Sequence, residues 1–211
     1  MNGVIAMVRM DLLKLLSMGK SLLLYLLVLL FFTMNDALFY LGSLLVLYVA
    51  VYTMSAYDEQ SKGIYLDGAL PVSRAQRVQA AYLYDLVVLA LSVVLSAAFS
   101  TALSTVGLRV GALSALSLQL AFLAGVAFLS TVQPLILWLG TTRARWWVLG
   151  LYCLGFATSG FLTAGTKAAS IAVAVLDVSL SGVGVALAGM AMLVISYLVA
   201  SRLYGRRQFT E

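Results

Sequence analysis

Three of the chain's few chemistry-bearing side chains lie inside apolar segments. Asp85, Gln119 and Gln133 are each flanked by runs of aliphatic residues. A polar group is costly in lipid, so each is a candidate to line a pathway for a polar or cationic molecule. A purely structural role is favoured over a role in a pathway. Asp85 could pair with Arg77 or Arg143, and the two glutamines could form interhelical hydrogen bonds.

The residue types that usually perform catalysis or hold metals are scarce. The sequence has no histidine, and its single cysteine, Cys153, lies in an apolar run. An internal disulfide, a Cys/His zinc cluster and histidine acid–base catalysis are therefore excluded. An intramembrane enzyme is disfavoured as well, because no second intramembrane carboxylate lies near Asp85 in the sequence. We expect no catalytic residue, no metal site and no cofactor in this chain.

The amino-acid composition indicates whether these residues are surrounded by water or by lipid. Hydrophobic residues make up 63% of the chain and charged residues 10%, and the mean hydropathy is +1.05. Soluble domains average about 25% charged residues. The chain is therefore predicted to be an all-α integral membrane protein, with one transmembrane domain over residues 1–211.

Apolar runs long enough to cross the bilayer, about 20 residues each, predict the membrane spans. The first run is short and requires Lys20 to snorkel to the interface. A cleaved signal peptide is the alternative for that run, but no small-residue cleavage site follows it. Pro134 predicts a kink near the end of the fourth span. The six predicted spans are 15–35, 37–57, 80–107, 112–140, 146–166 and 180–203.

The distribution of positive charge predicts the orientation of these spans. Of the thirteen lysines and arginines, eleven fall on one side of the predicted membrane. Only Arg109 and Lys167 fall on the other. By the positive-inside rule, both termini are cytoplasmic and the exterior connections are short. The net charge of +5 follows from this asymmetry, and we expect no nucleic-acid partner.

The connection at 58–79 is the only long cytoplasmic one. It begins with Asp58 and Glu59, and Pro71 favours an extended residue before it. Ser73, followed three residues later by glutamine, is a capping-box pattern that predicts a helix from about Arg74 into the third span. Such a connection could carry a push from a soluble partner into the membrane. The alternative is an ordinary capped helix start after a turn.

These residues also show a family resemblance. The stretch "YDEQSKGIYLDGALPVSRAQRVQAAYL" resembles the cytoplasmic loop between the second and third spans of type-2 ABC exporter permeases. Those proteins are small bacterial six-span membrane subunits without an ATPase domain of their own. The matching positions are Glu59, Tyr65, Leu70 to Arg74 and Val78 to Tyr82. The amino-terminal "VRMDLLKLL" is similar to the short interfacial helix that begins such subunits.

The resemblance implies a transport subunit of the bacterial cytoplasmic membrane that is not itself an enzyme. A separate ATPase subunit would bind ATP and Mg, and the chain indeed contains no G-x-x-x-x-G-K-[ST] pattern. Two permease chains, identical or related, would form the pathway, with an amphipathic peptide or hydrophobic compound as cargo. The resemblance places a coupling helix between spans two and three. Its implied ATPase-coupling residues are Asp58, Glu59, Tyr65, Leu70, Pro71, Val72, Ser73 and Arg74.

Two other classes of function share this topology. A substrate-binding membrane subunit of a vitamin importer has a similar number of helices, but it needs external loops that shape a ligand pocket. An accessory or immunity membrane protein would not need a coupling connection at all.

Overall fold

A computed structural model of the chain describes residues 3–17, 19–34, 38–60, 73–108, 114–163 and 182–206. These residues are helical apart from short turns, and no strand occurs among them. The all-α prediction is therefore confirmed for the described part of the chain. The helices are α1 (Gly3–Ser17), α2 (Gly19–Thr33), α3 (Phe39–Leu47), the π-helix η2 (Tyr48–Thr53), α4 (Met54–Gln60), α6 (Arg74–Thr105), α7 (Ala115–Leu139), α8 (Thr141–Thr163) and α10 (Gly182–Arg206).

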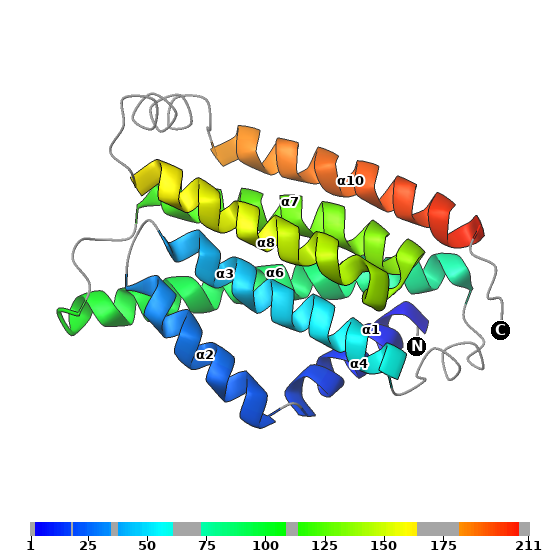
Figure 1. The fold of residues 1–211 in the computed structure, drawn as a ribbon, viewed down its shortest axis with the longest axis horizontal. Coiled ribbons are helices and arrows are strands. Elements are labelled where there is room, and N and C mark those ends of the chain that lie inside the picture. Colours follow the sequence, from blue (N-terminus) through cyan, green and yellow to red (C-terminus); the bar gives the residue numbers. More distant parts are fainter. Residues whose placement is uncertain are drawn as a thin grey trace.

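The long helices lie roughly along one axis, and each runs opposite to the long helix before it in the chain, so that α7 is parallel to its neighbours α10 and α3 (Figure 1). Helices α3, η2 and α4 are continuous, and we call Phe39–Glu59 the α3–α4 rod. Helix α7 packs against α10, the rod and α8, while α1 and α2 pack against α6 and the rod. The ends of the rod and of α10 and the starts of α6 and α8 lie together, next to α1 (Figure 1). We call this the Glu59 end of the bundle.

Four helices among the described residues are long and apolar enough to cross a membrane. They coincide with the predicted second, third, fourth and sixth spans. The predicted first span contains α2, which has only 15 residues. The predicted fifth corresponds to α8, which opens with the polar sequence TTRAR. The crossings made by these two helices, and the orientation of the bundle, stay predictions. The four are Phe39–Glu59, Ala75–Thr105, Ser117–Leu139 and Gly184–Tyr204.

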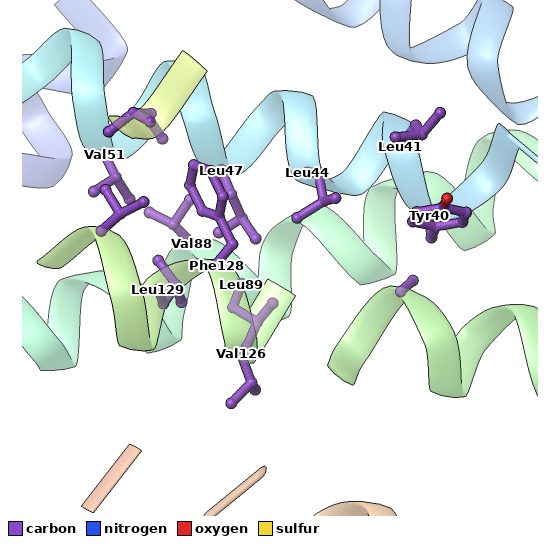
Figure 2. Packing of buried hydrophobic residues seen from close by; sticks show 14 of the residues in the cluster. Tyr40, Leu41, Leu44, Leu47, Val51, Val88, Leu89, Val126, Phe128 and Leu129 are labelled. Atoms are coloured by element: carbon purple, nitrogen blue, oxygen red, sulfur yellow. The ribbon is translucent and has the colours of Figure 1, made fainter. Parts of the chain in front are cut away.

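The main core forms where the rod, α6 and α7 meet (Figure 2). Leu47 of the rod, Leu89 of α6 and Leu129 of α7 are among the side chains almost completely buried there. A close approach of α7 is possible because Gly125 has no side chain. A Cβ at Gly125 would overlap Leu89 Cδ1 and lie 3.0 Å from Leu47 Cδ1.

Pro134, predicted to kink the fourth span, lies inside α7. Proline has no backbone N–H, so the carbonyl of Ser130, four residues earlier, loses its helical donor. The Ser196 hydroxyl of α10 donates to that carbonyl at 2.8 Å. The hydroxyl of Tyr82 in α6 lies 2.6 Å from Ser196 Oγ. The carbonyl freed by Pro134 is thus satisfied by a neighbouring helix, and α6, α7 and α10 are joined at one point.

Candidate functional site

Glu59 joins the end of the α3–α4 rod to the start of α8. Its Oε2 accepts the backbone N–H of Thr141 at 2.8 Å, and its Oε1 accepts the Thr142 hydroxyl at 3.2 Å. The preceding Gly140 has φ 78°, which separates α7 from α8. A helix N-terminus carries unpaired N–H groups and a partial positive charge, so a carboxylate is stabilised there. Glu59 therefore acts as a distant cap for α8.

Asp58, the preceding residue, joins the same rod to α1. Lys14 Nζ lies 2.9 Å from Asp58 Oδ1 and 3.0 Å from Asp58 Oδ2, and it also donates to Asp11 at 3.3 Å. Partial burial acts to lower the pKa of Lys14. The hydrogen bond to Asp58 and the charges of Asp11 and Asp58 outweigh this effect, and the pKa rises above its usual 10.5. Lys14 is therefore held in its charged form between two carboxylates.

Ser73 caps α6 as the sequence predicts. Its hydroxyl accepts the Gln76 N–H at 3.3 Å, and its own N–H donates to Gln76 Oε1 at 3.0 Å. The capping box is complete, and Arg74 is the first residue of the helix. The other predicted coupling residues, Tyr65, Leu70, Pro71 and Val72, lie outside the described residues. The coupling role of the whole set stays a prediction.

Two adjoining cavities lie at the Glu59 end, between α1, the rod, α6 and α7. One has a volume of about 130 Å³ and the other about 70 Å³. Their walls share Asp11, Ser55, Asp58, Ala81 and Gln133. Glu59 and Arg77 line the larger cavity, and Asp85 lines the smaller. Four of the chain's eight acidic residues thus converge on this space.

Asp85 is the most deeply placed of these acidic residues. It lies roughly 16 Å along α6 from the first residue of that helix, and only 1% of its surface is exposed. Gln133 approaches it, yet neither carboxylate oxygen has a hydrogen bond of acceptable geometry. The pairing with Arg77 or Arg143 that the sequence favoured is therefore wrong as a hydrogen-bonded contact. Arg77 lines the neighbouring cavity and Arg143 is exposed at the start of α8.

The three polar residues predicted as pathway candidates are not all brought together. Asp85 and Gln133 line the same cavity. Gln119 lies near the opposite end of α7, roughly 21 Å from Gln133 along the helix axis. It lines neither of the two cavities at the Glu59 end.

Sequence reasoning missed several residues of this site. Asp11 and Lys14 carry a usable signal, because opposite charges three residues apart on a helix lie on one face. Ser55 and Tyr84 carry none, since a serine and a tyrosine in an apolar run usually serve packing. Their hydroxyls donate to Val51 O at 2.8 Å and to Ala50 O at 3.2 Å, both in the π-helix η2.

The fold and site define a helical, multi-pass membrane protein with a polar cavity at one end and an interhelical junction beside it. A family model described as "ABC-2 family transporter protein" matches residues 7–205. The chain therefore belongs to the ABC-2 transporter family and is a membrane permease subunit of an ABC transporter. No match was found among curated proteins or among solved structures.

Proposed function

We propose that this chain is the membrane subunit of an ATP-driven exporter of the bacterial cytoplasmic membrane. A separate ATPase subunit binds the cytoplasmic connection 58–79 and supplies the ATP and Mg chemistry. Two permease chains, identical or related, enclose the pathway. The cargo is an amphipathic peptide or a hydrophobic compound, in keeping with the largely apolar helices.

One observation carries the proposal: the chain enters this connection from a rod that is fastened to two other helices. Asp58 is bound to Lys14 of α1, and Glu59 is bound to Thr141 at the start of α8. At the other end of the connection, α6 begins directly after its capping residue Ser73. A displacement of the connection would therefore reach α1, α8 and α6 together. This arrangement suits a segment that receives mechanical work from a soluble partner.

The proposal is tested by purifying the tagged chain from its native host in mild detergent. The intact protein is compared with the double variant Leu70→Asp/Arg74→Glu. We expect an ATPase to copurify with the intact chain and to be lost from the variant. Size-exclusion profiles establish that both forms remain folded.

A matched control applies the same two exchanges on the side predicted to be exterior, as Leu108→Asp/Arg109→Glu. That variant should retain the ATPase. Retention by both variants, or absence of any ATPase from the intact protein, would refute coupling through the connection 58–79.

A further inference from the structure

The smaller cavity has an unusual balance of hydrogen-bonding groups. The hydroxyl hydrogens of Ser55 and Tyr84 are donated to main-chain carbonyls of η2. Each hydroxyl oxygen is left with lone pairs and no hydrogen to offer. Asp85 adds two oxygens that receive no well-formed hydrogen bond, although the Gln133 amide approaches them. Apart from the amide of Gln133, the polar side chains around this carboxylate are therefore acceptors.

The charges that face this space are mostly negative. Asp85 comes from α6, Asp58 and Glu59 from the rod, and Asp11 from α1. On the positive side, Arg77 of α6 lines the larger cavity, and Lys14 of α1 lies between Asp11 and Asp58. Gln133 of α7 is uncharged. Lys14 and the α8 N-terminus compensate the carboxylates of the rod, whereas Asp85 has no such partner among the described residues.

We propose that the cavity at Asp85 is a binding site for a monovalent cation. Asp85 is the counter-ion, and the oxygens of Ser55, Tyr84 and Gln133 supply further contacts. An ionised carboxylate without a partner is very costly in an apolar interior, and a cation removes that cost. The shared chemistry is that of a small inorganic ion or of an ammonium group carried by an amine or a lysine side chain.

The ligand set favours a monovalent rather than a divalent cation, and the cavity is large enough to hold one. The cavity of about 70 Å³ exceeds the volume of one water molecule, about 30 Å³. No group of three or more His, Cys, Asp or Glu side chains in the described part of the chain is arranged to hold a metal ion. The wall of the smaller cavity also includes Val51 of the π-helix η2. Single π-helical turns inside α-helices occur frequently at functional sites.

The site is tested on the purified full-length chain in lipid nanodiscs, without an ATPase. Thermal unfolding is followed while Na⁺, K⁺ or methylammonium replaces N-methyl-D-glucamine at constant ionic strength. At a hundredfold excess over the dissociation constant, a bound cation should raise Tm on the order of 5 °C. The rise should saturate in the wild-type protein and be absent in Asp85→Asn. Ser96→Ala, which alters another buried side chain of α6, should respond like the wild type.

The cations distinguish the source of the ligand. A response confined to Na⁺ or K⁺ identifies a free ion, and one confined to methylammonium identifies an ammonium group of a larger molecule. If Asp85→Asn does not fold, Ser55→Ala decides, because it should shift the midpoint of the titration to higher cation concentration.

Three results would overturn the proposal. The first is an equal Tm shift in the wild type and Asp85→Asn. The second is an unchanged titration midpoint in Ser55→Ala. The third is no Tm shift with any cation, together with the infrared band of a protonated Asp85. The last result would show that a proton, not a cation, neutralises the carboxylate. The cation-site proposal is independent of the exporter proposal, because its test needs no ATPase partner. A negative result for one proposal does not affect the other.

Discussion

Lys14 Nζ and Asp58 Oδ1 lie 2.9 Å apart, although the two residues are 44 positions apart in the sequence. The side chains are 30% and 25% exposed, so the pair is partly shielded from solvent. It links α1, which the sequence predicts as an interfacial helix, to the residue at which the connection to α6 begins. Helix α1 is thereby part of the Glu59 end and not a separate appendage.

The first prediction concerns the pH dependence of this pair. The pKa of Lys14 is raised above 10.5 in the folded protein. Its contribution to stability is therefore complete below pH 10.5 and is lost as the pH rises through the folded-state pKa. We expect Lys14→Met to cost about 1 kcal/mol at neutral pH. The difference from wild type should vanish in strongly alkaline solution, as measured by denaturant unfolding in detergent over a pH series.

Lys14→Arg is the control for this pH effect. Arginine keeps its charge to higher pH than lysine, so this variant should keep the stabilisation where the wild type loses it. A difference between wild type and Lys14→Met that does not change with pH would show that the side chain acts by packing alone.

The second prediction concerns the cap that Glu59 provides for α8. Glu59→Ala removes both hydrogen bonds and the negative charge and should cost about 1–2 kcal/mol. Glu59→Gln keeps one carbonyl acceptor but loses the charge, and should cost about 0.5–1 kcal/mol. Thermal unfolding in detergent should rank the alanine variant below the glutamine variant.

Thr142→Val separates the two contacts of Glu59. It removes the hydroxyl donor while leaving the Thr141 N–H in place, so it should cost less than Glu59→Gln. Equal losses in Thr142→Val and Glu59→Ala would mean that the bond to the α8 backbone contributes nothing.

The third prediction tests the link between Ser196 and Pro134. Ser196→Ala leaves the Ser130 carbonyl and the Tyr82 hydroxyl without this partner, which should cost about 1–3 kcal/mol. Pro134→Ala restores a backbone N–H that can reach the Ser130 carbonyl. The double variant should therefore be more stable than Ser196→Ala alone, with rescue incomplete because Tyr82 still lacks its partner. Strictly additive effects in a double-mutant cycle would argue against the link.

The fourth prediction compares two helical glycines. Gly125→Ala gains about 1 kcal/mol of helix propensity but must displace Leu89, and overpacking typically costs about 1–3 kcal/mol. We expect net destabilisation on the order of 1 kcal/mol. A Cβ added at Gly150 would meet no atom within 4 Å, so Gly150→Ala should stabilise the protein. Unfolding of both variants under one condition checks the opposite signs, and stabilisation by both would refute the close packing at Gly125.

Local patterns predicted the helices well because their signals are contained in neighbouring residues. Ser73 and Gln76 fix the start of α6, and the apolar runs fix most of the helices around it. The polar site was less predictable, because Lys14 meets Asp58, and Glu59 meets Thr141, only after the helices have packed. Nothing near Asp85 in the sequence indicates that it would share a cavity with the hydroxyls of Ser55 and Tyr84, whose hydrogens are donated to main-chain carbonyls. Nor does a local pattern mark the π-helical segment.

The π-helical segment η2 determines how the two halves of the rod are rotated relative to each other about the helix axis. A π-helical hydrogen bond joins residues five apart where an α-helical one joins residues four apart, so the segment accommodates an extra residue. One residue corresponds to about 100° of rotation about the helix axis. Phe39 and Leu41 face the core before η2, while Asp58 and Glu59 face α1 and α8 after it. If one residue of η2 were deleted, the rotational phase of everything beyond it would turn by about that angle. The extra residue therefore sets the direction in which the polar end of the rod, with Asp58 and Glu59, faces relative to its apolar half.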